Sequence, residues 1–414
     1  MLTDIVVFDQ RWIPEHRTDN RAQRLRELAV RAQFLAGWAH ALMHRNVPPP
    51  APLTADSPAA GPAAPAGVRL LPACGAFIVV AGRIAPVAVD GVRVFRSQVD
   101  PRAFPHASPA VKSDPYWHLK KIGASQKTLA QPYLVGFLDS GIDPTHEDFR
   151  GLDIHYGEFD ALYALKPGAP AHDPDGHGTH VAGLVAGWTY GVAPGTHIAM
   201  AAVLPDAVFD SARILAGIEW LLATEFRPGI FGVDLINASM GGTGYDEVFR
   251  TPLQRALVQG TLTIAAVGNN GTAVGLLEYP ANYEEVLAVG ATREDDRVWL
   301  LSAWGVSPTA GAALPVPQLS APGEGITSTA TGGTARHVMR EGTSMAAAIV
   351  TGVAVLRMSR DPSLWRAPTA LRESLMLDLA PLVVLLNEGG WGRINANPAA
   401  PVDAASGAAA PCPD

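Results

Sequence analysis

Five continuous apolar runs recur along the C-terminal two thirds of the chain, and each ends in small or polar residues. They occupy residues 133–141, 197–204, 233–241, 262–269 and 286–292. A strand with one exposed face alternates between apolar and polar positions, whereas a strand buried on both faces is apolar throughout. The runs therefore predict strands of a buried, mostly parallel sheet.

Helical patterns fill the gaps between these runs. Helices are expected over 178–188, 211–224, 247–259 and 344–358. Strands that alternate with helices predict a doubly wound α/β domain, whose chemistry lies at the carboxyl ends of the strands. The polar residues expected there are Asp139, Ser239 and Asn269.

The N-terminal region has a different pattern. It predicts, in order, a strand at 3–10, a helix at 19–43, a strand at 70–82, a short helix or turn at 84–91 and a strand at 92–98. This series indicates a small α+β domain. A Pro- and Ala-rich stretch at 47–67 interrupts it as a linker or insertion, and residues 399–414 have the composition of a disordered tail.

Composition and charge narrow the function. The chain of 414 residues is 48% hydrophobic and 17% charged, as expected for a globular protein with a large core. With a net charge of -8 and no long basic run, it is not expected to bind nucleic acid. No apolar stretch reaches the ~18 residues that a membrane span needs, so a membrane partner is not expected either.

Cysteine usage and the first residues bear on metals and location. The two cysteines, Cys74 and Cys412, form neither a disulfide framework nor a CxxC metal motif. Acidic and basic residues are mixed in the first 20 positions, and Arg31 and His40 interrupt the next apolar run. A secretory signal has an uninterrupted apolar core, so no clear signal peptide is identified. A cytoplasmic location is favoured, and secretion by a non-standard route stays open.

Ser344 lies in the stretch EGTSMAAAIVTG, which runs from Glu341 to Gly352. Ser344 there either caps a buried helix or acts as a nucleophile. A serine nucleophile needs a base within hydrogen-bonding reach, and the base needs an anion that fixes its tautomer.

The rest of the chain supplies both groups. Asp139 ends an apolar run, and His177 follows a Gly-rich turn at the start of a small-residue helix. His180 lies three residues further on, but no carboxylate follows at ligand spacing and HExxH is absent, so no metal site is predicted. Asn269 could donate a hydrogen bond to an oxyanion.

Three stretches in the order FLDSGID, HGTHVAG and GTSMA resemble the signatures of the subtilisin-like serine proteases, the subtilases (peptidase family S8). The resemblance covers about residues 113–398 and includes GVAPG, INASMGG, AAVGNNG, YPANY, LSAPG and GWGRINA. It implies a subtilisin-like catalytic domain that hydrolyses peptide bonds in protein or peptide substrates through an acyl-enzyme.

The resemblance also implies roles for individual residues. Asp139 would orient the base His177, Ser344 would be the nucleophile, and Asn269 the side-chain oxyanion donor. His180 would be structural. The stretch that pairs with substrate backbone would be Ser239, Met240 and Gly241.

One position departs from the family pattern, because Ala348 stands where subtilases usually have Pro. In the first turn of a helix Pro only presets φ, and Ala is the best helix former. The departure is therefore expected to reduce rigidity and to leave the chemistry unchanged.

The N-terminal series is similar to the ferredoxin-like propeptide that precedes many subtilase domains. The resemblance implies a propeptide-type domain at 1–111, a catalytic domain at 112–398 and autoprocessing near Lys112, with Arg102 as second choice. The N-terminal domain would be an intramolecular inhibitor and folding chaperone, and the protein a zymogen. An unrelated docking domain is the alternative.

Two other functions stay open at this point. A peptide-maturing or macrocyclising subtilase would pass the acyl group to an amine instead of water. A catalytically silent binding protein would have lost part of the site, which the presence of the whole residue set argues against.

The resemblance also bears on cofactors, of which none is required. Many subtilases have a calcium-binding loop between the His helix and the GVAP stretch. Here HGTHVAGLVAGWTYGVAPG leaves no room for that loop, and Ca²⁺ needs six or more oxygen ligands. The tight site is expected to be absent, while weaker calcium binding elsewhere stays open.

Specificity is the last expectation. The residue before the YP stretch lies at the floor of the pocket for the substrate P1 side chain in subtilases, and here it is Glu278. A carboxylate there would favour Lys or Arg at P1, unless it points to solvent. Asp210 could add a second negative charge.

Overall fold

The structure is a computed structural model. It describes residues 3–14, 18, 20–43, 50–54, 57, 62–80, 84, 87–101, 114–124, 133–271, 277–308, 314–382, 384 and 386–397. Lys112, Arg102 and the tail at 399–414 lie outside these residues. No helix in the described part is both long and apolar enough to cross a membrane.

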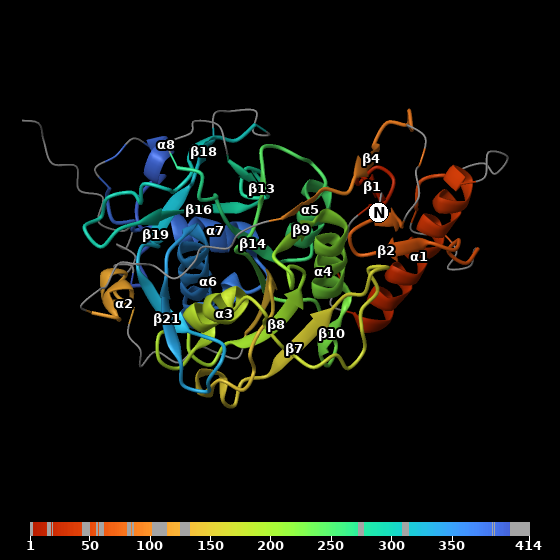
Figure 1. The fold of residues 1–414 in the computed structure, drawn as a ribbon. Coiled ribbons are helices and arrows are strands. Elements are labelled where there is room, and N and C mark those ends of the chain that lie inside the picture. The colour runs from red at the N-terminus through yellow and green to blue at the C-terminus, as the bar shows by residue number, and fades with distance from the viewer. Residues whose placement is uncertain are drawn as a thin grey trace, which may run out of the picture.

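A seven-stranded sheet forms the centre of the molecule (Figure 1). Its order is β19-β16-β14-β12-β6-β8-β7, and every pairing is parallel. Five strands coincide with the apolar runs: β6 (Leu134–Asp139), β8 (His197–Ala202), β12 (Leu235–Ala238), β14 (Leu262–Ala266) and β16 (Leu287–Thr292). The two edge strands, β7 (Ile154–Glu158) and β19 (Leu319–Pro322), were not predicted.

Helices cover both faces of this sheet. The α3 (His177–Ala186) and α6 (Thr343–Arg360) helices share a core with Val135 and Phe137 of β6. The α4 (Ser211–Ala223) and α5 (Arg250–Val258) helices share another with Leu134 and Leu138, which alternate with the first pair. The predicted doubly wound α/β fold is therefore confirmed.

The N-terminal unit is a four-stranded antiparallel sheet with one long helix. Its elements are β1 (Asp4–Phe8), α1 (Arg21–Met43), β2 (Val68–Leu71), β3 (Ala76–Val79) and β4 (Val92–Arg96). The sheet order is β2-β3-β1-β4. Strands β1 and β2 both pair with β3 in antiparallel fashion, so β1-α1-β2 is a split β-α-β unit.

One detail of the predicted N-terminal series was wrong. The single strand expected at 70–82 is a hairpin, because the chain reverses at Gly75, whose φ of +63° favours glycine. The described residues of 84–91 form no helix and end in a turn before β4. The described residues of the Pro- and Ala-rich stretch (50–54, 57 and 62–67) belong to no helix or strand.

The N-terminal unit packs against the face that carries α4 and α5 (Figure 1). Ile5, Cys74 and Ile78 lie in one apolar cluster with residues of α4. Arg255 of α5 is fully buried in this contact and donates to the carbonyl oxygens of Phe8 and Ile13, at 2.9 Å each. The two parts of the chain thus share a continuous core.

The remaining elements are short. They are β5 (Val99–Pro101), α2 (Trp117–Lys121), β9 (Val208–Asp210), β10 (Glu225–Arg227), β11 (Ile230–Phe231), β13 (Gly242–Thr243), β15 (Glu278–Tyr279), β17 (Gly305–Val306), β18 (Pro315–Val316), β20 (Ile326–Thr329), β21 (His337–Arg340), α7 (Pro368–Met376), α8 (Leu386–Gly389) and 3-10 turns at Glu147–Phe149 and Pro362–Leu364. Among them, β5 pairs with β9 in antiparallel fashion and so links the two parts a second time.

Candidate active site

The candidate residues gather at the carboxyl edge of the central sheet. Asp139 is the last residue of β6, His177 is the first of α3, and Ser344 is in the first turn of α6. Helices α3 and α6 pack against each other. The neighbouring strands β6 and β12 lie where the chain turns from one half of the sheet to the other, which is where such folds place their sites.

Asp139 and His177 form a fully buried hydrogen-bonded pair. The imidazole Nδ1 lies 2.7 Å from the Asp139 Oδ1, and both side chains are inaccessible to solvent. The Ser140 main-chain N–H donates to the same carboxylate oxygen at 2.7 Å. A carboxylate only accepts, so Nδ1 carries the proton and Nε2 carries the lone pair of a base.

Ser344 is tied to the end of β12. Its hydroxyl donates to the Ser239 carbonyl oxygen at 3.1 Å, and the Ser239 hydroxyl donates to the Ser344 carbonyl oxygen at 3.0 Å. Ser344 is buried but retains 4% of its surface. This exchange of hydrogen bonds fixes the start of α6 beside the strand end.

The Asn269 side chain is oriented by Thr343. Its Oδ1 accepts from the Thr343 main-chain N–H at 2.9 Å and from the Thr343 hydroxyl at 3.0 Å. The Gly268 N–H in turn donates to that hydroxyl at 3.2 Å. With its oxygen held by the residue before Ser344, the amide directs its two N–H donors away from Thr343.

Ala348 does not lie where the sequence suggested. It was expected in the first turn of its helix, but α6 begins at Thr343, so Ala348 occupies the second turn and is fully buried. Proline at an interior helix position removes a main-chain hydrogen bond, and alanine keeps it. Alanine therefore favours a regular helix directly behind Ser344.

Comparison with known proteins identifies the family. The model of the subtilase family matches residues 131–392, which include Asp139, His177 and Ser344. The chain belongs to the subtilase family.

Several relatives agree with this assignment. Subtilisin-like protease PopC of Myxococcus xanthus is 33% identical over 256 residues, which is 56% of this chain and 52% of PopC. Subtilisin E of Bacillus subtilis is 33% identical over 237 residues, 55% of this chain and 56% of that protein. An extracellular serine proteinase of a Thermus species is 32% identical over 68% of this chain and 65% of its own. The chain thus spans little more than half the length of the first two relatives.

A solved structure agrees with the fold. A protease from Pseudoalteromonas arctica superposes with a TM-score of 0.57 and covers 71% of this chain and 98% of its own. At 23% sequence identity this likeness concerns the fold alone.

The sequence reasoning missed Asp173 and Ser140, which surround the candidate residues Asp139 and His177. The Ser140 hydroxyl donates to Asp173 Oδ1 at 2.8 Å and accepts from the Gly178 N–H at 2.9 Å. Asp173 also accepts from Gly176 and Thr179 at the start of α3. The available signal was a carboxylate in DPDGHGTH, four residues before the histidine.

His180 has the environment of a structural residue, as predicted. Its Nε2 lies 3.1 Å from the Ile326 carbonyl oxygen and 3.2 Å from that of Val338. Burial holds the pKa of His180 well below its ordinary value, aided by the positive charge of Arg340. A neutral imidazole that donates to carbonyl groups connects α3 to β20 and β21.

Glu278 lies against the stretch predicted to bind substrate. Strand β15 pairs with β13, and a β-carbon added to Gly241 would lie 2.8 Å from the Glu278 carboxylate. One added to Gly268 would lie 2.7 Å from the Glu278 Cγ. The half-buried side chain is thus placed between two glycine backbones, and Asn270 donates to it at 3.1 Å.

Asp210 caps a helix. Its Oδ1 accepts from the N–H groups of Ala212 and Arg213 as the N-cap of α4, and from the Ser97 hydroxyl. The carboxylate thus binds the helix start and the chain leading into β5, and a second specificity charge at this position stays a prediction.

Among the described residues, one cluster has the composition of a metal site. Candidate ligand atoms of His146, Asp148 and His337 lie within 4.8 Å of one another. Both His146 nitrogens are already used, since Nδ1 accepts from the Asp148 N–H and Nε2 donates to the Arg336 carbonyl oxygen. The Asp148 carboxylate accepts from Thr189 and lies 3.2 Å from His337 Nε2. In this arrangement the atoms bond to one another and to neighbouring groups.

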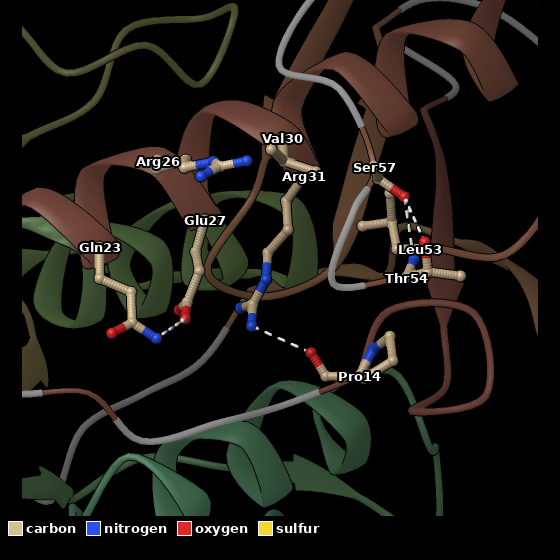
Figure 2. A pocket seen from close by; sticks show the side chains of 9 residues that line it. All are labelled: Pro14, Gln23, Arg26, Glu27, Val30, Arg31, Leu53, Thr54 and Ser57. Atoms are coloured by element: carbon tan, nitrogen blue, oxygen red, sulfur yellow. Dashed lines mark hydrogen bonds between the residues drawn. The ribbon is translucent and has the colours of Figure 1, made fainter.

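A separate cavity lies in the N-terminal unit (Figure 2). Its volume is about 330 Å³, and α1 supplies most of its charged lining. Arg31 spans it to donate to the Pro14 carbonyl oxygen at 3.1 Å, and Gln23 donates to Glu27. It contains none of the candidate catalytic residues and is distinct from the active site.

Proposed function

We propose that this subtilase is a serine endopeptidase in which Ser344 is acylated by the substrate. The observation that carries the proposal is the buried 2.7 Å hydrogen bond between His177 Nδ1 and Asp139. It holds the imidazole in the tautomer whose Nε2 can take the Ser344 proton. His177 then returns this proton to the leaving amine, and water hydrolyses the acyl-enzyme by the same route.

Asn269 serves as an oxyanion donor in this scheme. The tetrahedral intermediate places a negative charge on the former carbonyl oxygen, and a preorganised N–H donor stabilises it. Two hydrogen bonds from Thr343 to the Asn269 side-chain oxygen support this role, because they orient the amide N–H groups.

Labelling by a fluorophosphonate tests the nucleophile directly. The probe phosphonylates an activated serine, so one label per chain is expected on the peptide that contains Ser344. The S344A variant is the negative control, and the H177A variant should react far more slowly because its serine lacks the base. An unlabelled wild-type protein would contradict the proposal.

The N-terminal unit acts in this proposal as an intramolecular inhibitor and folding chaperone. Strand β5 pairs with β9 as Val99↔Asp210, Asp100↔Phe209 and Pro101↔Val208. An extended peptide that adds to an exposed strand edge in this way is a common mode of peptide recognition. The unit also shares an apolar core with the catalytic part. The catalytic part therefore buries all of its apolar core residues only when the unit is docked.

Autoprocessing would separate the two parts near Lys112, with Arg102 as the second choice. Arg102 directly follows β5, and Lys112 lies ten residues further along the chain. N-terminal sequencing of purified protein distinguishes the two sites, and the S344A variant should remain uncut.

The P1 preference for Lys or Arg rests on Glu278. Its carboxylate lies between the backbones of Gly241 and Gly268, beside the stretch from Ser239 to Gly241 that pairs with substrate. A basic P1 side chain would pair with this carboxylate, whereas an apolar side chain would remove water from it and offer no opposite charge.

Calcium at the usual tight site is not part of the proposed mechanism. The segment after α3 is held by protein contacts, since the Trp188 N–H donates to the Asp148 carbonyl oxygen and Thr189 to its carboxylate. Both Asp148 carboxylate oxygens have protein partners, so they do not fit the ligand set of a calcium ion.

A further inference from the structure

A buried carboxylate that belongs to none of the three proposed catalytic residues contacts the residue directly after β6 and the start of α3. Asp173 is 8% exposed and lies in the turn before α3. Its Oδ1 accepts from the Gly176 N–H at 2.9 Å and the Ser140 hydroxyl at 2.8 Å. Its Oδ2 accepts from the Thr179 N–H at 2.8 Å and the Thr179 hydroxyl at 2.7 Å. Four donors from three residues converge on it.

The first set of contacts fixes the base. Gly176 and Thr179 stand on either side of His177, and their N–H groups belong to the first turn of α3. Such N–H groups lack partners within the helix and need a cap. Gly176 itself has a φ of +82° and no side chain that could serve. Asp173 therefore determines the main-chain position from which His177 projects.

The second set reaches the acid through Ser140. The Ser140 hydroxyl lies 2.8 Å from Asp173 and 3.3 Å from Asp139, so its single proton is directed at Asp173. Its oxygen accepts from the Gly178 N–H of α3. The Ser140 main-chain N–H meanwhile donates to Asp139 Oδ1, the oxygen that also holds His177.

We propose that Asp173 is a positioning residue that fixes Asp139 and His177 relative to each other. It does so by clamping Ser140 at the end of β6 to the first turn of α3. It touches no reacting atom, and no proton passes through it. The role rests on the proposed peptidase function, because it matters to catalysis only if His177 is the base.

The charge of Asp173 gives the role a signature that helix capping alone lacks. A nearby carboxylate favours the protonated imidazole. Among the described residues, the charged or titratable groups near His177 include Asp139, Asp173, Asp175, His180 and Arg340. Replacing Asp173 by its neutral isostere removes one negative charge from this set, and the acid limb of the pH profile should move to lower pH.

The D173N variant is the central test, and D143N is its matched control. The Asp143 carboxylate lies in the same loop region but accepts from Thr145 and touches neither the acid nor the base. We expect D173N to lower kcat by about 10- to 100-fold through misplacement of the base, with KM changed less than about twofold. D143N should match wild type in both constants.

A second variant keeps the test decisive if D173N folds poorly. S140A removes the hydroxyl link and leaves every charge in place, so it should lower kcat by about tenfold without moving the acid limb. An effect of D173N and S140A on melting alone, with kcat within about twofold of wild type, would overturn the proposal.

An observation that needs no turnover separates this proposal from the peptidase assignment. The proton between His177 Nδ1 and Asp139 should give a far-downfield resonance in the proton NMR spectrum of S344A. Adding D173N to that background should shift or broaden the resonance, whereas D143N should not. An unchanged resonance would overturn the positioning role, while a normal response together with an inactive wild type would refute only the peptidase function.

Discussion

The edge of the central sheet and the contact with the N-terminal unit both bury charged side chains, but they satisfy them differently. At the edge, Asp139 and Asp173 accept hydrogen bonds from side chains and from the first turn of a helix. At the contact, Arg255 is satisfied by main-chain carbonyl groups of Phe8 and Ile13, which belong to the other part of the chain. The hydrogen bonds at the sheet edge determine where the protons of the site lie. The hydrogen bonds of Arg255 hold the N-terminal unit against the rest of the chain.

The two regions should therefore differ in what a substitution affects, activity at the sheet edge and stability at the contact. Losing a group at the sheet edge should abolish chemistry and leave folding intact, because other buried contacts hold the same strands and helices. Losing the guanidinium at the contact should weaken folding and leave the geometry of the candidate site intact, because Arg255 donates to carbonyl oxygens of the N-terminal unit. The following experiments test that separation.

The largest effect is expected from S344A. Removing the nucleophile should reduce kcat for a peptide substrate by about 10⁶-fold, since base, acid and serine act as a unit. The melting temperature should stay close to that of wild type. Retained turnover in a preparation free of wild-type enzyme would refute Ser344 as nucleophile.

The opposite pattern is expected from R255M. It leaves the Phe8 and Ile13 carbonyl oxygens buried without this donor, and each lost partner costs about 1–3 kcal/mol. Urea unfolding, measured in the S344A background to prevent autolysis, should show a loss of about 3 kcal/mol. R21M is the control, because the Arg21–Glu225 ion pair is exposed and should contribute less than about 1 kcal/mol.

Labelling of R255M in the active-serine background completes this test. The fluorophosphonate should react with the variant at least as fast as with wild type, since the site is unchanged and the inhibitory unit is less firmly docked. A slow reaction together with normal stability would mean that Arg255 belongs to the site after all.

A smaller effect on specificity is expected from E278G. The ratio of kcat/KM for Lys over Leu at P1 should fall by about 10- to 100-fold, because the variant removes the charge that pairs with the substrate. A matched peptide pair that differs only at P1 measures this ratio. Equal preference for Leu or aromatic residues by both proteins would disprove the pocket assignment and leave the peptidase assignment in place.

The smallest effect is expected from calcium removal. A chelator should lower Tm by less than about 2 °C, because the segment after α3 is held by Asp148 through protein contacts. D148N should lower Tm equally with and without calcium. A large chelator effect that D148N abolishes would show that Asp148 binds the ion.

The sequence predicted the sheet for a physical reason, and it indicated the candidate site at the edge of that sheet. Continuous apolarity marks strands buried on both faces, and a polar residue at the end of such a strand is conspicuous, as Asp139 is. The edge strand β7 was missed because IHYGE is half-buried and mixes apolar with polar side chains. Gly75 could have revealed the β2–β3 hairpin, since PACG is a turn-prone interruption of the apolar run.

Residues whose role comes from long-range contacts could not be predicted from the sequence. Nothing near Arg255 in the sequence shows that its guanidinium is fully buried, because its acceptors lie more than 200 residues earlier. Asp173 and Ser140 are 33 residues apart and meet only once α3 has packed on β6. Such side chains look like ordinary surface or turn residues until the fold brings their partners together.

The pairing of β5 with β9 also determines how dilution acts on the protein. While both strands belong to one intact chain, β9 meets its occupant at an effective concentration on the order of millimolar, whatever the amount of protein in solution. A cut after β5 makes the N-terminal unit a separate molecule, and occupancy of β9 then depends on total concentration and on Kd. Dilution would therefore lower the occupancy of β9 only in protein that has been cut, and the effect of dilution would distinguish cut from intact chains.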